Sequence, residues 1–301
     1  MASRPLSVTP GSLRAWLLAT RLPTLTAGIA PVAVGSGVAL RDGQFQLAPA
    51  LAALVGALAL QVGANFANDL SDFRRGADTS TRIGPPRVTQ LGLLSQRQVL
   101  AGMLAFFAVA TTAGLYLSFV GGWPIVAIGL ASILAAITYT GGPWPFGYRG
   151  LGELFVFIFF GLVAVTGTYY VQAGEVTRDA VLAAIPVGLT VTAILVVNNV
   201  RDIDTDRAAR KFTLAVYLGR RLARYQYVLF MAGAYLSAAA LFLLGSFSGW
   251  TLLSWLSIPA AVSPVIAVLT RVEGPPLNAA LRATARVHFL FAILLAIGLS
   301  Q

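Results

Sequence analysis

Long apolar stretches, separated by short polar or basic segments, recur along the whole 301-residue chain. Many of them reach about 20 residues, the length of helix that crosses a ~30 Å hydrocarbon core. This pattern predicts an all-α membrane protein with about nine transmembrane helices. The predicted spans are residues 17–40, 47–68, 99–120, 123–140, 151–172, 179–199, 225–246, 250–270 and 284–300.

Composition supports a membrane protein over a soluble one. Hydrophobic residues make up 57% of the chain and charged residues 11%, whereas a soluble domain carries about 25% charged residues. The chain has no cysteine, which excludes disulfides, iron–sulfur clusters and thiolate zinc sites. The first residues are polar and lack the apolar core of a cleavable signal peptide.

The basic residues are distributed unevenly between the predicted loops. They concentrate in the N-terminal segment and in the loops after the second, fourth, sixth and eighth spans, while only Arg41 and Arg178 fall on the other side. Because cytoplasmic loops are enriched in Lys and Arg, we expect a cytoplasmic N-terminus in the inner (plasma) membrane. The net charge of +10 then indicates the lipid bilayer as a partner, not nucleic acid.

More than half of the 11 acidic residues lie in two short clusters. The first follows the second span and contains Asn65, Asn68, Asp69 and Asp72, with Asp78 beyond it. On a helix, Asn65, Asn68 or Asp69, and Asp72 share one face, since residues three or four apart are neighbours.

The second cluster ends the sixth span and contains Asn198, Asp202, Asp204 and Asp206. Asn198, Asp202 and Asp206 share one helical face, and Asp204 points elsewhere. Both spans run toward the cytoplasm, so we expect the two faces to converge there. An alternative is that these acids only balance nearby Arg residues in the headgroup region.

Crowded carboxylates are unfavourable unless a cation compensates them. Asn and Asp oxygens suit a hard cation such as Mg²⁺. A basic rim of Arg82, Arg87 and Lys211 would neutralise phosphate, although the same side chains also suit anionic lipid. A diphosphate site beneath an apolar bundle fits a prenyl diphosphate, whose tail dissolves in the bilayer.

The two clusters are four predicted spans apart, and each is followed by a basic stretch. This spacing predicts a duplicated four-helix unit within a single domain. The first repeat would cover about residues 15–140, the second about 151–270, and 284–300 would form an extra helix.

Four segments carry a resemblance to a known family. Residues 68–95 and 198–219 resemble the two signatures of the UbiA prenyltransferase superfamily, and 21–35 with 139–161 resemble its menaquinone branch. That branch transfers a polyprenyl group from a prenyl diphosphate to 1,4-dihydroxy-2-naphthoate, with loss of CO₂. The resemblance therefore implies a Mg²⁺-dependent membrane enzyme with these two substrates, built as a helical bundle around a central cavity.

Candidate residues follow from the clusters together with this resemblance. Asp72, Asp202 and Asp206 are expected to be catalytic, and Glu153 is a candidate for acceptor binding or proton removal. Expected metal ligands are Asn68, Asp69, Asp72, Asp202 and Asp206; expected diphosphate contacts are Asp78, Arg82, Arg87, Asn198 and Lys211; and expected substrate contacts are Asn65, Tyr139, Phe155 and Tyr169.

Several alternatives remain open at this stage. A cation-coupled transporter would place its acids near the bilayer midplane between inverted repeats, whereas these acids lie at helix ends. A transferase that uses CDP-alcohols would have one acidic signature instead of two. Within the superfamily, 4-hydroxybenzoate, homogentisate or a carboxynaphthoquinone would be the other acceptors. The lone His288 lies away from both clusters, and we expect it to pack rather than act as a base.

Overall fold

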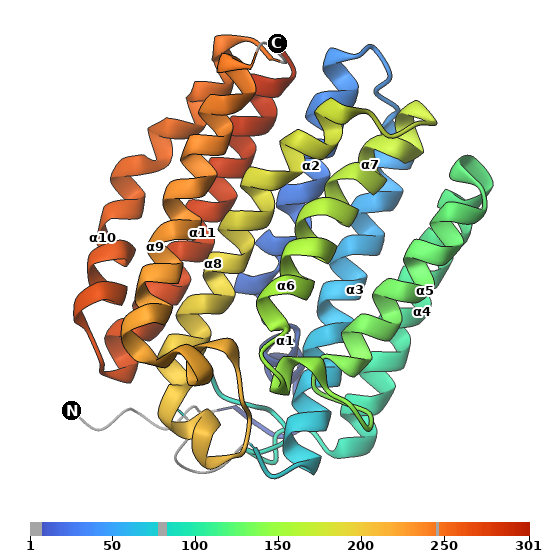
Figure 1. The fold of residues 1–301 in the computed structure, drawn as a ribbon. Helices are drawn as coiled ribbons and strands as arrows, with labels where there is room; N and C mark the ends of the chain where they lie inside the picture. Colours follow the sequence, from blue (N-terminus) through green and yellow to red (C-terminus); the bar gives the residue numbers. More distant parts are fainter. Residues whose placement is uncertain (1–7, 78–82, 245–246) are drawn as a thin grey trace.

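The computed structural model describes residues 8–77, 83–244 and 247–301, and these residues form helices and connecting loops without a β-strand. The helices are α1 (Leu13–Thr20), η1 (Leu22–Thr24), α2 (Thr26–Arg41), α3 (Leu47–Arg74), α4 (Gln96–Gly121), α5 (Trp123–Thr138), η2 (Phe146–Tyr148), α6 (Gly152–Val156), the π-helical η3 (Phe157–Val163), α7 (Ala164–Ala173), α8 (Arg178–Ala208), α9 (Leu214–Leu243), η4 (Gly249–Ser257), α10 (Ile258–Thr270) and α11 (Gly274–Leu299) (Figure 1).

Each predicted span coincides with a helical segment, which confirms the all-α membrane fold. Within the described residues, seven helices are long and apolar enough to cross a membrane, and the first segment makes an eighth if its two halves, bent by 46°, count as one span. The fourth predicted span is the shorter apolar helix α5, of 16 residues. The chain is a multi-pass membrane protein.

Two helices continue well past the ends predicted from hydropathy. α3 runs to Arg74 and α8 to Ala208, because a helix extends beyond the hydrocarbon region as long as its polar residues can reach water or protein partners. Both helices end at the lower side of the molecule in Figure 1, where α1 also lies. The two acidic clusters therefore remain on rigid helices rather than on loops.

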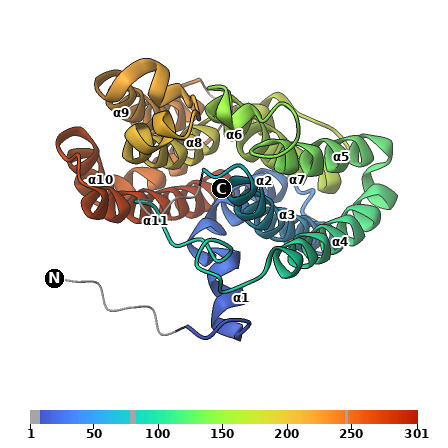
Figure 2. The same ribbon diagram turned by 90° about the horizontal axis from the view of Figure 1, so that it is seen from below.

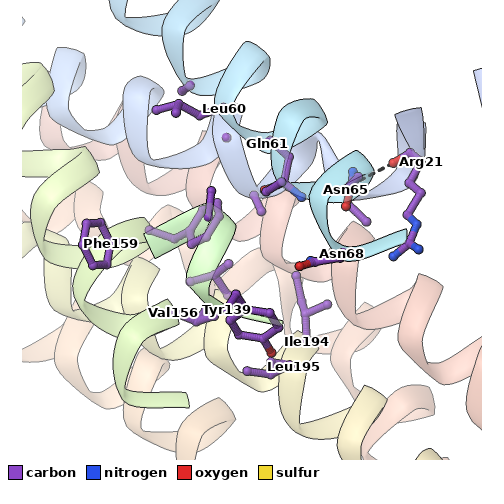
Figure 3. Close-up of a pocket in the computed structure, with 18 of the residues that line it drawn as sticks. Arg21, Leu60, Gln61, Asn65, Asn68, Tyr139, Val156, Phe159, Ile194 and Leu195 are labelled. Atoms are coloured by element: carbon purple, nitrogen blue, oxygen red, sulfur yellow. Dashed lines mark hydrogen bonds between the residues drawn. The ribbon is translucent and has the colours of Figure 1, made fainter. Parts of the chain in front are cut away.

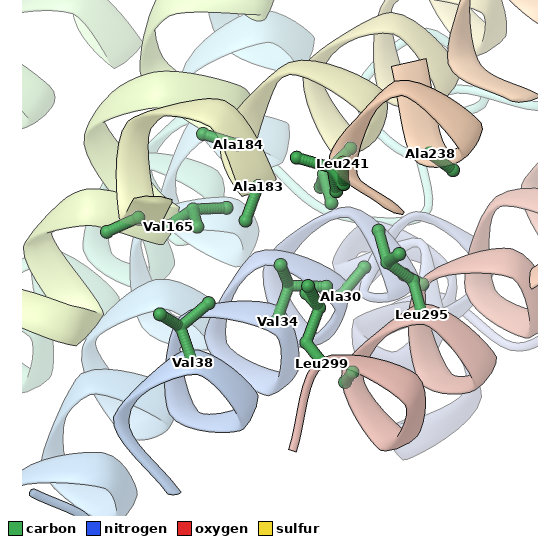
Figure 4. Packing of buried hydrophobic residues seen from close by; sticks show 14 of the residues in the cluster. Ala30, Val34, Val38, Val165, Ala183, Ala184, Ala238, Leu241, Leu295 and Leu299 are labelled. Atoms are coloured by element: carbon green, nitrogen blue, oxygen red, sulfur yellow. The ribbon is translucent and has the colours of Figure 1, made fainter. Parts of the chain in front are cut away.

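Helix α2 occupies the middle of the bundle, against α3, α7, α8 and α11 (Figure 2). Glycine permits this close approach: a Cβ on Gly37 would lie 2.6 Å from the carbonyl oxygen of Ala296 in α11. Small and β-branched side chains such as Val34 and Ala184 fill the remaining space with Leu295 (Figure 4). This core holds α3 and α8 at fixed positions on either side of α2.

An ionic cluster ties α2 to α8 at the end of the bundle opposite the acidic clusters. Arg41 pairs with Asp42 and Asp179, each at 2.8 Å. The Tyr169 hydroxyl donates a hydrogen bond to Asp42 Oδ2 at 2.8 Å. These half-buried pairs fix the two helices together at this end.

Candidate functional site

A cavity of about 960 Å³ reaches from the ends of α3 and α8 into the apolar interior, and α2 to α8 and α11 contribute to its wall. Side chains of both acidic clusters line it, so the predicted convergence of the two helix faces is observed in the structure. Figure 3 shows Asn65 and Asn68 of the first cluster on the cavity wall. The lining residues from the clusters are Asn65, Asn68, Asp72, Asn198, Asp202 and Asp206.

Asp72 is the buried end of the first cluster. Its Oδ2 lies 2.6 Å from Nη2 of Arg87, and its Oδ1 accepts a hydrogen bond from the Tyr148 hydroxyl at 2.8 Å. One turn earlier, Asn68 Oδ1 accepts a hydrogen bond from Thr140 at 2.9 Å. The loops that follow α3 and α5 thus supply the partners of this cluster.

Asp202 in the second cluster is held by the neighbouring Arg201. The guanidinium group donates to both carboxylate oxygens, at 2.7 and 2.5 Å. It also donates to Oδ1 of Asn198 and to Oδ1 of Asn278 in α11, each at 2.8 Å. The Arg201 side chain is fully enclosed, so it links α8 to α11 and compensates the charge of Asp202 inside the protein.

Asp206 has the least satisfied carboxylate of the three. Its Oδ1 lies 3.5 Å from Nζ of Lys211, and its buried Oδ2 has no hydrogen-bond partner among the described residues. Asp204, by contrast, is 77% exposed and pairs with Arg220. The α8 register therefore turns Asp202 and Asp206 inward and Asp204 outward.

The donor set fits a hard cation. Among the described residues, no three His, Cys, Asp or Glu side chains lie close enough to form a ready-made metal site. Asp and Asn oxygens from both clusters nevertheless line one cavity, and the buried Asp206 Oδ2 lacks a partner. Because Mg²⁺ keeps several ligands from water and substrate phosphate, a few protein oxygens on two sides of a cavity suit it.

Three predicted site residues do not line the cavity. Asp69 accepts hydrogen bonds from the backbone N–H groups of Val88 and Thr89, at 3.1 and 3.2 Å, and so holds the loop that carries Arg87. Tyr169 lies in the ionic cluster at the opposite end. Both are adjacent in sequence to lining residues, Asn68 and Thr168, but a helix turns the next side chain about 100° away.

Glu153 is the third, and it lies buried behind the cavity wall. Its Oε1 accepts a hydrogen bond from Asn199 at 2.9 Å, while Oε2 has no partner among the described residues. The predicted diphosphate contacts Asp78 and Arg82 lie outside the described residues. The other predicted diphosphate contacts, Arg87, Asn198 and Lys211, all line the cavity.

An aromatic wall borders the cavity. Phe155 stacks on Phe146 with ring centroids 4.0 Å apart, and Tyr139 meets Phe146 edge to face at 5.3 Å. Tyr139 and Phe155 were predicted from sequence and line the cavity. The wall continues along the π-helical stretch that contains Phe159 (Figure 3).

Sequence reasoning missed two side chains that organise the carboxylates. Arg201 is not among the predicted site residues, although its place between Asn198 and Asp202 is a usable signal. Tyr148 was not singled out, because nothing in the sequence shows that the loop after α5 folds back onto Asp72.

The fold and the cavity define a multi-pass membrane protein that can hold a ligand with a polar, anionic head and a long apolar body. Comparison with known families identifies it further. The model of the UbiA prenyltransferase family matches residues 28–297. The chain belongs to this family, and it is a prenyltransferase.

Individual relatives cover nearly the whole chain. The 1,4-dihydroxy-2-naphthoate octaprenyltransferase of Mycobacterium leprae is 37% identical over 95% of this chain and 96% of its own length. The apo structure of a UbiA homolog from Aeropyrum pernix superposes with a TM-score of 0.70 at 18% identity, over 90% of this chain and 96% of that one. A UbiA homolog from Archaeoglobus fulgidus bound to GPP and Mg²⁺ gives a TM-score of 0.63 at 17% identity, over 93% and 99%.

Proposed function

We propose that this protein transfers a polyprenyl group from a polyprenyl diphosphate to 1,4-dihydroxy-2-naphthoate, with release of CO₂, as a step of menaquinone biosynthesis. The observation that carries the proposal is the meeting of two carboxylate clusters at the polar end of a cavity whose remainder is apolar. The acceptor is supported by the mycobacterial relative, which is a 1,4-dihydroxy-2-naphthoate octaprenyltransferase. The metal and the donor class are supported by the archaeal homolog that binds GPP and Mg²⁺.

The polar end of the cavity is the proposed diphosphate site. Asn68, Asp72, Asp202 and Asp206 would hold Mg²⁺, which when bound stabilises the negative charge that develops on the leaving diphosphate. Arg87, Lys211 and Asn198 would hold the diphosphate oxygens. In the structure Asp72 and Asp206 pair with Arg87 and Lys211, so substrate binding exchanges these ion pairs for basic–phosphate contacts.

The aromatic wall is the proposed site of bond exchange. As the bond between C1 and the diphosphate oxygen breaks, its electron pair leaves with the diphosphate and an allylic cation develops at C1. The faces of Tyr139 and Phe155 stabilise this charge. An electron-rich ring carbon of the acceptor then forms the new C–C bond and loses its proton, which restores the aromatic ring. The carboxylate leaves as CO₂, and a proton takes its place on the ring. Holding both reactants in a dry cavity lowers the entropy cost of their encounter.

Three further features belong to this proposal. The enzyme would lie in the inner (plasma) membrane with its N-terminus and active site toward the cytoplasm, a placement supported by the concentration of Lys and Arg in loops on one side. The two halves of the bundle, about residues 15–140 and 151–270, would be copies of one ancestral four-helix unit. Asp69 would act indirectly, through the loop that it holds next to Arg87.

The acceptor assignment is tested with purified protein, Mg²⁺ and a series of polyprenyl diphosphates. Each is incubated with 1,4-dihydroxy-2-naphthoate or with 4-hydroxybenzoate, and the products are identified by mass spectrometry. We expect a prenylated naphthalenediol that has lost CO₂ and little product from 4-hydroxybenzoate. Efficient prenylation of 4-hydroxybenzoate with no naphthoate product would contradict the acceptor assignment and leave the donor site intact.

A further inference from the structure

Gln61 presents a buried amide to the cavity. It lies on α3, one turn before Asn65 on the same helical face, and it lines the cavity (Figure 3). Gln61 is 9% exposed, and its Oε1 has no hydrogen-bond partner among the described residues. Asn65 differs, because its amide donates to the carbonyl oxygen of Thr20 and to Thr24 Oγ1, each at 2.9 Å.

No partner for Oε1 of this amide is found among the described residues of the wall. The other residues of α3 that line the cavity at this depth are Ala57, Leu60 and Ala64, and their side chains carry no polar atom. A buried amide without a partner destabilises the folded state. Leu or Met would fill the same space without that penalty. The presence of an amide at this position is therefore explained by a hydrogen bond to a bound ligand.

The position of Gln61 along α3 excludes the diphosphate as the hydrogen-bond partner of its amide, and the chemistry of the prenyl tail excludes the tail. At a rise of 1.5 Å per residue, Gln61 lies about 10 Å deeper in the bundle than Asn68 and about 16 Å deeper than Asp72. A diphosphate bound at those residues ends well short of it. The prenyl tail reaches this depth but offers no hydrogen-bonding group. The remaining polar ligand is the aromatic acceptor, which must lie beside C1 on the apolar side of the diphosphate.

We propose that Gln61 binds a ring hydroxyl of the aromatic acceptor. The amide carries both an acceptor oxygen and N–H donors, and a phenolic hydroxyl both donates and accepts, so the two groups are complementary in either orientation of the amide. The contact fixes which ring carbon faces C1 of the prenyl group. This inference rests on the proposed function and adds a specificity-determining residue for its acceptor.

The test compares Gln61→Met with Gln172→Met. Both glutamines are buried in membrane helices, but Gln172 is satisfied inside the protein, with Nε2 donating to the Thr168 carbonyl oxygen at 2.7 Å and Oε1 accepting from the Gln46 backbone N–H at 3.3 Å. Steady-state KM values for acceptor and for polyprenyl diphosphate are measured separately, and thermal unfolding in detergent is recorded for each variant.

For Gln61→Met we expect the acceptor KM to rise about tenfold, as the loss of one hydrogen bond predicts. The KM for polyprenyl diphosphate should stay at the wild-type value. The unfolding temperature should not fall. Gln172→Met should lower the unfolding temperature and leave the acceptor KM of the folded protein unchanged. The inference is overturned if Gln61→Met keeps the wild-type acceptor KM, or if it lowers the unfolding temperature as Gln172→Met does.

The same measurements separate this inference from the proposed function. If the wild-type protein does not prenylate the naphthoate, the proposed function fails. If the wild-type protein does, and Gln61→Met binds both substrates as the wild type does, only the role of Gln61 is wrong.

Discussion

At the residue scale, each carboxylate of the site has a different electrostatic partner. Asp202 is held by the enclosed Arg201, Asp72 by Arg87 and Tyr148, and Asp206 only by a longer contact with Lys211. Charges buried this deeply are stable only when they are paired and hydrogen-bonded. The pairs thus hold the acids in place without the proposed metal, and Asp206 is the acid that would bind a cation at the lowest cost in lost contacts.

Asp206 and Asp204 give a matched pair of substitutions on one helix. Asp206→Ala removes a proposed metal ligand, so turnover should fall by orders of magnitude, as for other electrostatic groups that stabilise a leaving group. Asp204→Ala removes only an exposed contact with Arg220 and should have a small effect. Turnover and thermal stability of both variants are the measurements. Equal losses of turnover would show that the assumed face of α8 is wrong.

Arg201 is expected to support the fold as well as the site. Arg201→Met leaves the buried Asp202 carboxylate unpaired and removes the link to Asn278, which should cost about 3–5 kcal/mol of stability. Arg207→Met, at an exposed position on the same helix, should cost less than about 0.5 kcal/mol. Denaturation of the purified variants in detergent measures both. If Arg201→Met is as stable as the wild type, Arg201 does not support the fold.

At the element scale, helical periodicity predicted the site faces of α3 and α8 because neighbours at three- and four-residue spacing share a face. Periodicity does not separate residues that are adjacent in sequence, and so it predicts Asp69 as a metal ligand and leaves Tyr169 as a substrate contact, although neither lines the cavity. It also says nothing about loops: the contact of Tyr148 with Asp72 depends on how the segment after α5 folds back. The apolar spans were predicted well, since hydrocarbon thickness fixes their length.

The glycines in the apolar part of the cavity suggest how long a tail the enzyme accepts. A Cβ added at Gly129 in α5 would meet no atom within 4 Å, and Gly129 lines the cavity. Gly129→Leu should therefore fill tail space and shift the preference toward shorter polyprenyl diphosphates, while Gly129→Ala should behave as wild type. The measured quantity is kcat/KM across a series of donor lengths. An unchanged preference in Gly129→Leu would place the tail elsewhere.

At the scale of the whole molecule, joint binding of one diphosphate requires both carboxylate clusters to face the same side of the membrane. α3 and α8 end on the same side of the bundle (Figure 1), and basic loops follow both helices. In the proposed topology this side faces the cytoplasm, as the positive-inside rule favours. The enzyme would take its donor from the bilayer while the diphosphate stays near the cytoplasmic surface.

Single cysteines test this orientation directly, since the chain has none of its own. A cysteine at Ala209, after α8, should react only with a membrane-impermeant reagent applied from the cytoplasmic side. A cysteine at Ser248, before η4, should react only from the other side. Labelling of the Ser248 position from the cytoplasm would reverse the proposed topology.

The central claim is that Asp and Asn side chains from α3 and α8 bind a diphosphate jointly through Mg²⁺. Calorimetric titration of purified protein with geranyl diphosphate, in Mg²⁺ and in excess chelator, tests it most directly, with Asp206→Ala as the variant and Asp204→Ala as the control. We expect binding in Mg²⁺ for wild type and Asp204→Ala, and loss of binding in chelator or in Asp206→Ala. Equal binding with and without the metal, or wild-type affinity in Asp206→Ala, would contradict it.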